Sequence, residues 1–423
     1  MNRSWLLALV LFSALDAGPA PAQAQDSAMA LAMRVLRTTP LIDGHNDLPW
    51  AIRTSEAAKG RVEDYDLRGR APGHTDLARL KAGMLGGQFW SVYIPGDFQD
   101  SGYARVQLEQ IDIARRMIQR YPDAFQWALT ADGMRRAFAA GRIGSVLGLE
   151  GGHAIENSLG ALRVYYDLGA RYMTLTHNVT LDWADAASGQ ARHGGLTAFG
   201  EEVVSEMNRL GMLVDLSHVS PGTMSDALNV TEAPVIFSHS GSRALVDHPR
   251  NVPDSILRRL PANGGVVMVP FVTSFVSAAV RAHDLVRDRD SSALAGRLGS
   301  DTAAVRRALE AWNRANPAPV ARLGDVADQI EHVRRVAGVD HVGIGSDFDG
   351  ISRTIEGLED VSTFPRLFAE LARRGWSEAD LRKLAGENVL RVMSRVEEVA
   401  MRLRRERAPS SRTIQELDGR PGG

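Results

Sequence analysis

Eight short apolar runs alternate with stretches of helical periodicity along most of the chain, and this alternation constrains the fold more than any other feature. Each run has about the length of a strand that is buried on both faces of a parallel sheet. The runs are residues 40–43, 87–94, 143–149, 172–176, 212–217, 235–238, 265–269 and 341–346. Strands that alternate with helices in this way favour a parallel sheet.

Helical patterns lie between these runs. Residues 103–120 and 159–168 carry apolar residues at helical spacing, and residues 198–210 do so up to Gly211, a typical helix C-cap. Eight such units predict an α/β fold, a closed (β/α)8 barrel of the TIM type, with a doubly wound open sheet as the alternative. Residues 278–327 have a helical pattern too long for a normal crossover, so we expect a helical insertion before the last strand.

The N-terminal segment predicts export. Arg3, the apolar residues 5–15 and the small residues of Ala22-Gln23-Ala24 together have the pattern of a signal peptide over residues 1–24. The apolar run stops at Asp16, too soon to span about 30 Å of hydrocarbon, so an uncleaved anchor is the less favoured alternative. We therefore expect the protein to be periplasmic or secreted after removal of the signal peptide.

The rest of the chain divides into one domain and a tail. Residues 25–405 hold all the predicted strands and form the expected barrel domain. Residues 406–423 are charged and then rich in Ser, Gly and Pro, which predicts a frayed, disordered tail. The tail lacks the apolar segment that a glycolipid anchor signal needs, so no stable membrane anchor is expected.

Composition excludes several classes of function. The 49 Lys and Arg residues are balanced by 51 Asp and Glu residues, which argues against a nucleic-acid partner. The chain has no cysteine, so disulfides, thiolate metal sites and cysteine nucleophiles are excluded. Any chemistry must therefore come from His, Asp, Glu, Ser, Arg and Tyr.

Polar residues stand directly after most of the predicted strands. They are His45 and Asp47 after the first run, Glu150 after the third, His177 after the fourth, His218 after the fifth, His239 after the sixth and Asp347 after the eighth. In a barrel these residues would meet at the carboxyl-terminal rim, where such folds place their chemistry. A lone histidine after a strand is more often a hydrogen-bonded loop residue, but the repeated placement indicates a shared site.

The types of these residues indicate a metal centre. His45 and Asp47 are two positions apart, so in an extended strand both side chains project to one side. Imidazole and carboxylate ligands suit zinc or another borderline divalent ion. His218 and His239 are candidates for holding a second ion, with Glu150 as the candidate bridge. The alternative is a set of buried polar residues that satisfy one another without metal, which would be energetically costly.

The same residues lie in motifs that resemble the renal (membrane) dipeptidase family of zinc peptidases, a branch of the amidohydrolase-type metal barrels. The most specific stretch runs from Leu149-Glu150-Gly151-Gly152-His153 to residues 169–178 and follows the family's long signature. Further matches are Asp43-Gly44-His45-Asn46-Asp47, Asp215-Leu216-Ser217-His218, Phe237-Ser238-His239-Ser240, residues 250–254 and residues 345–350. Together the matches extend over about residues 40–395.

The resemblance implies a metallopeptidase that hydrolyses dipeptides at a centre of two zinc ions. Its implied metal ligands are His45 and Asp47 for one ion, His218 and His239 for the other, and Glu150 as the bridge. A hydroxide shared by the two ions would attack the peptide carbonyl. The oligomeric state stays open, although homodimers are common in the family.

The resemblance also implies roles for residues around the ions. Asp347 would act as general base and then general acid, His177 would face the scissile carbonyl, and Arg250 would bind the free carboxylate of the dipeptide. Ala170 departs from the signature, which usually has a larger aliphatic residue there. Phe275 stands where mammalian members place a tyrosine that contacts the carboxylate. Carboxylate recognition would then depend more heavily on Arg250, and substrate preference would differ.

Several other residues keep more than one interpretation. His153 is a candidate for a hydrogen bond that supports the site or for a substrate contact, and Asp349 for a supporting partner or a turn residue. Trp183 would pack either on the substrate or within a rim loop. His74, His193, His248, His283, His332 and His341 have no strand-end partner and are interpreted as surface or core histidines. No nucleophile motif surrounds Ser217, Ser238 or Ser240, so serine catalysis is not expected.

Two alternative functions remain at this point. Another metal-dependent barrel amidohydrolase, such as a lactonase, deaminase or esterase, would use the same ions, although Arg250 favours a peptide-like substrate with a free carboxylate. A non-enzymatic exported binding protein would have no need of Asp347 as a proton shuttle.

Overall fold

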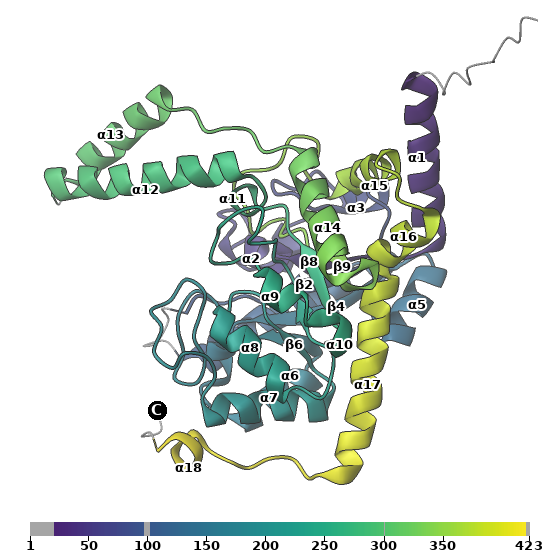
Figure 1. Ribbon diagram of the computed structural model, residues 1–423, viewed down its shortest axis with the longest axis vertical. Helices are drawn as coiled ribbons and strands as arrows, with labels where there is room; N and C mark the ends of the chain where they lie inside the picture. Colours follow the sequence, from purple (N-terminus) through teal and green to yellow (C-terminus); the bar gives the residue numbers. More distant parts are fainter. Residues whose placement is uncertain (1–20, 97–101, 300, 420–423) are drawn as a thin grey trace, which may run out of the picture.

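A closed ring of eight parallel strands forms the centre of the molecule (Figure 1). The structure is a computed structural model that describes residues 21–96, 102–299 and 301–419, with side chains from residue 27. The ring strands are β1 (Leu41–Asn46), β2 (Leu85–Ser91), β4 (Ile143–Glu150), β5 (Ala170–Thr174), β6 (Leu213–Asp215), β7 (Ile236–Phe237), β8 (Val266–Val269) and β9 (Val342–Ile344). Each neighbouring pair is parallel, and pairing of β9 with β1 and of β2 with β4 closes the ring. The predicted (β/α)8 barrel is confirmed, and the open doubly wound sheet is wrong.

One further strand, β3 (Phe125–Trp127), was not predicted. It pairs with residues 143–145 at the start of β4, whereas β5 pairs with residues 147–150 of the same strand. β3 therefore flanks the amino-terminal end of the barrel and takes no part in the ring. Three residues are too short a segment to give a clear apolar pattern.

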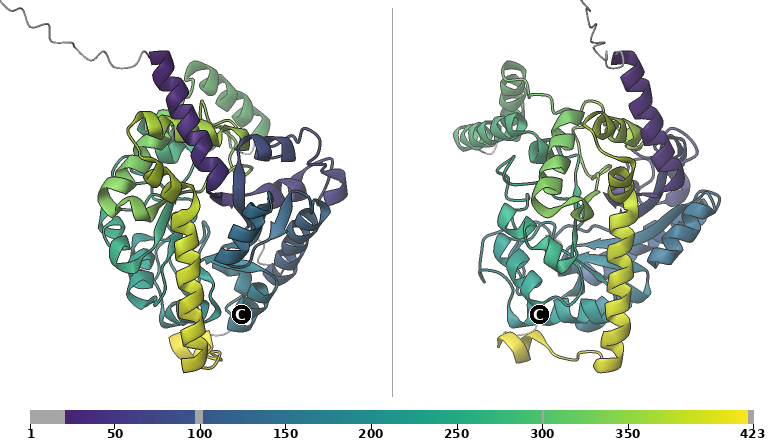
Figure 2. Two further views of the ribbon diagram at one scale, coloured as in Figure 1. Left: turned by 90° about the vertical axis from the view of Figure 1, so that its right-hand side faces the viewer. Right: turned by 45° about the vertical axis from the view of Figure 1, so that its right-hand side comes forward.

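Helices surround the barrel (Figures 1 and 2). The predicted helices are confirmed as α4 (Tyr103–Arg120), α6 (Leu159–Asp167) and α7 (Ala198–Leu210), and Gly211 ends α7 with a φ of 80°. The other helices are α1 (Pro21–Thr38), α2 (Leu48–Thr54), α3 (Leu77–Ala82), α5 (Ala131–Ala139), α8 (Pro221–Val230), α9 (Asp254–Leu257), α10 (Leu260–Asn263), α11 (Thr273–Val276), α12 (Ala278–Leu298), α13 (Thr302–Ala315), α14 (Leu323–Ala337), α15 (Phe364–Arg373), α16 (Glu378–Arg382), α17 (Asn388–Glu406) and α18 (Ile414–Asp418). Short 3₁₀ turns are η1 (Val62–Asp64), η3 (Gly152–Ile155), η4 (Val339–His341) and η5 (Val361–Thr363), and a π turn, η6 (Lys383–Glu387), precedes α17.

Alternation along the strands decides which side chains fill the barrel. In β4, Val146 belongs to the buried interior cluster together with Tyr172 of β5. Gly148 faces the ring of Tyr172 so closely that a Cβ there would overlap it. Because side chains alternate along a strand, Glu150 points to the same interior as Val146 and Gly148, at the carboxyl-terminal end.

The predicted insertion is a helical hairpin. α12 and α13 extend away from the barrel, and α14 then returns to it before β9 (Figure 1). Val280 is buried in α12, whereas α13 has no buried residue in the part of the hairpin that the structure describes. Few core contacts hold the hairpin, so its attachment depends on polar contacts near its base.

The two ends of the domain pack against the barrel helices. α1 lies beside α15 and α16, and α17 runs along the outside of the barrel (Figure 2). Most of the predicted signal peptide, residues 1–20, lies outside the described residues, so that prediction is untested. Among the described residues, no helix combines the length and apolarity that crossing a membrane requires.

The segment predicted to be a frayed tail contains a docked helix. Ile414 of α18 is buried, and the Asp418 carboxylate accepts hydrogen bonds from Thr197 Oγ1 at 2.6 Å and from the Phe199 amide at 3.1 Å. These contacts place a carboxylate at the amino-terminal end of α7, where a negative charge is stabilising. One apolar and one acidic side chain in a polar tail give little sequence signal for docking.

Candidate metal centre and active site

The residues predicted from the strand ends lie together at the carboxyl-terminal end of the barrel. A cavity of about 450 Å³ is lined there by Asp47, Glu150, His177, His218, His239, Arg250, Phe275 and Asp347, among others. His45 lies at its floor, fully buried, and contacts Asp47 and Glu150. The structure thus brings together all nine predicted site residues, although they come from seven different strand ends and loops.

The Glu150 carboxylate lies between two groups of side chains. Its Oε2 atom is 3.4 Å from His45 Nε2. Its Oε1 atom is 3.0 Å from His218 Nε2 and 3.5 Å from His239 Nε2. A carboxylate that presents one oxygen to each group has the arrangement expected of a bridge between two cations.

Two more carboxylates complete the His45 side of the centre. Asp47 Oδ2 lies 3.3 Å and Asp347 Oδ1 lies 3.9 Å from His45 Nε2. His45 lies in β1, whereas Asp47 is the N-cap residue of α2 with φ −94° and ψ 21°, so the two do not project from one extended strand as their spacing predicted, although both side chains reach this centre. A Cβ at Gly350 would lie within 3 Å of oxygens of both Asp47 and Asp347, so glycine is needed at that position.

The tautomers of two histidines indicate that a cation belongs in this centre. His218 Nδ1 lies 3.2 Å from Asn178 Oδ1, an acceptor, so Nδ1 carries the proton and Nε2 has a free lone pair. His239 Nδ1 likewise donates to Ser238 Oγ at 2.8 Å, because that hydroxyl donates its own proton to Asp215. Burial lowers the pKa of both imidazoles well below the ordinary value, so both are neutral.

These two Nε2 atoms face each other at 2.9 Å, and both face Glu150 Oε1. Lone pairs and a carboxylate oxygen in such contact repel one another unless a cation lies among them. His45 Nε2 and Asp47 Oδ1 are also buried without a hydrogen-bond partner among the described residues. The residues therefore fit a divalent metal, and their nitrogen and oxygen donors suit zinc-like ions.

Three overlapping groups have ligand atoms close enough for a metal ion. They are His45, Glu150 and His239; Glu150, His177 and His218; and His45, Asp47 and Asp347. Glu150 and His45 each belong to two of the groups, and Glu150 is the member that joins His45 to His218. His177 Nε2 lies 3.8 Å from Glu150 Oε1. His177 was predicted only to contact the substrate carbonyl, but it also lies beside the predicted metal ligands.

Sequence reasoning missed the groups that orient the imidazoles. The Tyr172 hydroxyl lies 2.8 Å from His45 Nδ1, and Asn178 and Ser238 support His218 and His239 in the same way. With Nδ1 engaged in each ring, Nε2 is the atom left to bind metal. The sequence feature that could have indicated this support is Tyr172, whose polar hydroxyl stands on the inward face of a predicted strand.

Two buried aspartates join neighbouring strand ends beneath the site. Asp215 accepts hydrogen bonds from Thr174 Oγ1 at 2.6 Å, from the Ser217 amide at 3.0 Å and from the Ser238 amide at 2.8 Å. Asp43 accepts from the amide and the hydroxyl of Ser346, both at 2.7 Å. These bonds fix the relative positions of strands that carry ligands.

Arg250 and Phe275 form one wall of the cavity. The Arg250 guanidinium is buried and lies 5.1 Å from the centre of the Phe275 ring. Its Nη2 atom donates to the His239 carbonyl at 3.4 Å, and its Nε has no hydrogen-bond partner among the described residues. Burial lowers the pKa of Arg250 to about 10, so the group is still a cation at neutral pH. A buried cation with an unused donor suits an anionic part of a ligand.

The electrostatics of the remaining titratable groups follow from burial. Burial lowers the pKa of His177 to about 3, with Arg250 adding to the effect, so His177 is a neutral imidazole. Burial raises the pKa of Asp347 well above its usual range; His45 opposes this, and Asp47 and Glu150 reinforce it. A bound cation would act in the opposite direction on such carboxylates.

Two residues of the site have unusual backbone conformations. His218 has a φ of 68° and Asp347 has a φ of 67°, in the left-handed region that non-glycine residues rarely adopt. Such strain costs about 1–3 kcal/mol and persists where the surroundings fix the residue. Here it aims a histidine from the loop after β6 and a carboxylate from the loop after β9 into one cavity.

The structure decides between the two interpretations of Trp183, His153 and Asp349. Trp183 is fully buried against Gly152 and Phe199, outside the cavity lining, so it is a packed loop residue. His153 donates from Nε2 to the Ile94 carbonyl at 2.9 Å and does not line the cavity. Asp349 binds the His74 amide at 2.7 Å, which makes it a turn residue that also holds a neighbouring loop. His74, for which no strand-end partner was expected, contacts the loop after β9, because its Nδ1 accepts from the Asp349 amide at 2.9 Å.

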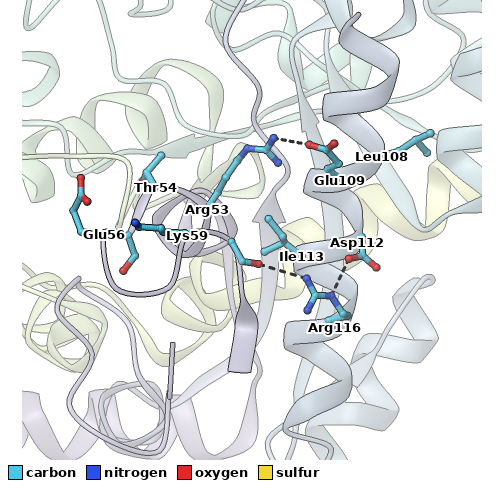
Figure 3. A pocket seen from close by; sticks show the side chains of 11 residues that line it. Arg53, Thr54, Glu56, Lys59, Leu108, Glu109, Asp112, Ile113 and Arg116 are labelled. Atoms are coloured by element: carbon cyan, nitrogen blue, oxygen red, sulfur yellow. Dashed lines mark hydrogen bonds and ion pairs between the residues drawn. The ribbon is translucent and has the colours of Figure 1, made fainter. Parts of the chain in front are cut away.

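A larger cavity, of about 790 Å³, lies between α2 and α4 and has a different character (Figure 3). Four of its charged groups form pairs: Arg53 contacts Glu109 at 2.8 Å, and Arg116 contacts Asp112 at 2.8 Å. It contains no histidine, so it lacks the donors that characterise the barrel cavity.

Comparison with solved structures supports the same fold. The chain is similar to the probable dipeptidase PvdM from Pseudomonas aeruginosa, with 24% identity, a TM-score of 0.76 and coverage of 90% of this chain and 100% of the other. It is similar to a dipeptidase of metallopeptidase family M19, with 26% identity, a TM-score of 0.69 and coverage of 85% and 99%.

A third similar structure is a metallopeptidase from Rhodobacter sphaeroides liganded with a phosphinate mimic of the dipeptide L-Ala-D-Ala. Its identity is 25%, its TM-score is 0.69, and the match covers 85% of this chain and 99% of that one. The family model of membrane dipeptidases, peptidase family M19, matches residues 29–407, nearly the whole chain. The side chains at the end of the barrel also form groups that could hold a divalent metal ion. The chain therefore belongs to the M19 membrane dipeptidase family and is a metallo-dipeptidase.

Proposed function

We propose that this chain is a binuclear zinc dipeptidase in which His45 and Asp47 hold one ion, His218 and His239 hold the other, and Glu150 bridges them. The observation that carries the proposal is the division of the Glu150 oxygens, with Oε2 beside His45 and Oε1 beside His218 and His239. A single ion would not need ligands on both sides of one carboxylate. Bound divalent ions supply a lowered pKa for a coordinated water and polarisation of the scissile carbonyl.

Arg250 is proposed to bind the carboxyl terminus of the dipeptide. The buried guanidinium with its unused Nε would form a charge-assisted pair with the carboxylate, while Phe275 fixes the guanidinium plane. Such a clamp sets the distance from the carboxylate to the reacting amide bond and so selects dipeptides over longer chains. The dipeptide mimic bound to the Rhodobacter sphaeroides relative supports this substrate class, including a D residue at the carboxyl-terminal side.

Asp347 is proposed to transfer the proton. Its place at the cavity wall, with Oδ1 3.9 Å from His45 Nε2, suits a carboxylate that accepts a proton from the attacking water and returns it to the leaving amine. His177, held neutral by burial, would donate a hydrogen bond to the oxygen that becomes negative on the carbonyl. Both side chains come from fixed strand ends, so neither needs to move far.

The test combines metal analysis with a dipeptide panel on the purified protein. We expect two zinc equivalents per chain by ICP-MS and hydrolysis of Ala–Ala in L,L or L,D form. Glu150→Gln should lose at least one equivalent, with Glu156→Gln as a matched control on the exposed surface near the same strand end. Two equivalents retained in Glu150→Gln would end its role as a bridge.

A different hydrolytic specificity on the same metal centre is the second candidate. A lactonase, deaminase or esterase would use the same ligands, but the buried Arg250 favours a substrate with a free carboxylate. A panel of dipeptides, lactones and carboxyl esters separates these activities. Lactone hydrolysis without dipeptide hydrolysis would favour the second candidate.

We also propose that residues 1–24 direct export and that the mature enzyme acts in the periplasm or outside the cell. The support is the pattern of Arg3, the apolar residues 5–15 and Ala22-Gln23-Ala24. The amino-terminal sequence of the protein recovered from culture fractions tests this: we expect it to begin near residue 25. Recovery of an intact terminus from the cytoplasm would contradict it.

A further inference from the structure

A second cavity lies directly beside the catalytic one. Its volume is about 440 Å³, and it is lined by His283, Asp284, Arg287 and Asp288 of α12, by Asn313, Asn316 and Ala318 at the end of the hairpin, and by Ser352 and Arg353. Ser352 and Arg353 also line the catalytic cavity. The insertion and the loop after β9 therefore enclose a compartment that adjoins the site of reaction.

An ion pair between Arg353 and Asp284 lies where the two cavities meet. Arg353 follows Asp347 in the loop after β9, and its Nη2 atom contacts Asp284 Oδ2 at 2.5 Å. Asp284 also lies 3.5 Å from His283 Nδ1. This pair attaches the weakly packed hairpin to the rim, and it holds the Arg353 guanidinium where both cavities meet.

The compartment adjoins the end of the catalytic cavity that would hold the substrate carboxylate. Phe275, which stacks on Arg250, belongs to α11, and α12 begins two residues after α11 ends. α11 and α12 also contact each other. A residue whose carboxylate binds Arg250 would therefore have its side chain next to the hairpin.

The lining of the compartment contains two guanidiniums and two carboxylates, and the guanidiniums keep unused hydrogen-bond donors. A guanidinium has five N–H donors. Arg353 contacts Asp284, and Arg287 donates from Nε to Asn313 Oδ1 at 3.3 Å, so each has donors beyond those bonds. The Asp284 carboxylate already contacts Arg353 and His283, and Asp288 lies 3.9 Å from Arg287. An acceptor-rich, anionic group matches this lining best.

We propose that this compartment is a subsite for the side chain of the carboxyl-terminal residue of the dipeptide and that it favours a long side chain ending in a carboxylate. The inference rests on the proposed dipeptidase function and on Arg250 as the carboxylate clamp. Arg353 and Arg287 would share the anionic side chain, with Asp284 as the positioning residue that fixes Arg353.

The first test compares Ala–Glu with Ala–Gln, Ala–Leu and Ala–Lys, each with an L or a D second residue, on the zinc-loaded full-length enzyme. Because hydrogen bonds to charged groups are stronger than neutral ones, kcat/KM for Ala–Glu should exceed that for Ala–Gln by about fivefold to tenfold. The difference should appear mainly in KM. Equal values for Glu and Gln, or a preference for Lys, would overturn the proposal.

A pair of variants on one helix separates the subsite from the hairpin as a whole. Arg287→Gln should lower the Ala–Glu to Ala–Leu ratio of kcat/KM by about fivefold, because one charged donor is lost. Arg297→Gln, an exposed residue of α12 outside both cavities, should leave that ratio unchanged. An unchanged ratio in Arg287→Gln would remove the compartment from substrate recognition.

Product inhibition gives an independent measure. Free glutamate should inhibit Ala–Ala hydrolysis at about fivefold lower concentration than free glutamine, and Arg287→Gln should abolish the difference. Failure to hydrolyse any dipeptide would instead refute the proposed function, and the subsite would fall with it. Hydrolysis of all dipeptides at similar rates would refute the subsite alone.

Discussion

The hydroxyl of Tyr172 is the feature whose removal tests the metal centre most directly. It lies 2.8 Å from His45 Nδ1, and the ring is fully buried in the barrel beside Gly148. If His45 binds a metal through Nε2, its Nδ1 carries a proton that must be donated, and the Tyr172 oxygen is the acceptor. Tyr172→Phe keeps the ring and removes only this acceptor.

The magnitude follows from the burial of His45. A buried donor without a partner costs about 1–3 kcal/mol, and every 1.4 kcal/mol is a factor of ten in affinity. Loss of a supporting partner of a metal-bound histidine weakens metal binding by about 10- to 100-fold. We therefore expect the zinc Kd of the His45 and Asp47 site to rise by that factor, while the site of His218 and His239 changes little.

The assay is a zinc titration of metal-free protein against a competing fluorescent chelator. The matched control is Tyr165→Phe, which removes another buried hydroxyl, one that donates to the Ala154 carbonyl at 3.1 Å and touches no predicted ligand. We expect similar loss of stability in both variants by urea unfolding, but weaker zinc binding in Tyr172→Phe alone. Equal zinc affinities for Tyr172→Phe and the wild type would refute the role of this hydroxyl.

Three further predictions concern the proton, the substrate and acid stability. Asp347→Asn should keep its zinc by ICP-MS and lose about 10²- to 10⁴-fold in kcat, and near-normal kcat would exclude Asp347 from proton transfer. Arg250→Ala should raise KM for dipeptides by about 10- to 100-fold at unchanged metal content, and an unchanged KM would exclude it from the substrate site. Burial lowers the pKa of His153 to about 4 from the ordinary 6.5, so the unfolded chain takes up its proton first and stability is lost as pH falls from 6.5 towards 4. At 1.36 kcal/mol per pKa unit this loss amounts to about 3 kcal/mol of unfolding free energy between pH 7 and pH 4. His153→Gln keeps a donor for the Ile94 carbonyl, so urea unfolding at the two pH values should show a loss smaller by that amount. An equal pH dependence of the two proteins would contradict the prediction.

The barrel and its ligands could be predicted from sequence because both depend on local patterns. A buried parallel strand is a short apolar run, and the residue after it lies at a known end of the barrel. Glu150 shows this most clearly, since alternation from Val146 through Gly148 sets its direction before any partner is known. β3 was missed because three residues carry no such pattern.

The supporting contacts could not be predicted because they depend on register between strands. Tyr172 reaches His45 only because β5 and β1 place their inward residues at matching heights across the barrel. The spacing of residues within one segment does not determine the relative height of two strands. Asp349 and His74 are 275 positions apart and meet only through the closure of the ring. Trp183 had two interpretations for the same reason, since its neighbour Gly152 belongs to a different strand end.

The position of the insertion explains how substrate preference could change without loss of the metal centre. The proposed ligands come from β1, β4, β6 and β7 or directly follow them, and Asp215 and Asp43 join these strand ends beneath the site. The hairpin enters between β8 and β9, which supply Phe275 and Asp347 but no proposed ligand for zinc. Its polar contact with Arg353 lies at the cavity wall, so changes in α12 would alter what the cavity admits while leaving the ligand geometry fixed by the barrel. Variants of Arg287 and of Tyr172 should therefore separate cleanly, the first changing selectivity and the second changing zinc affinity.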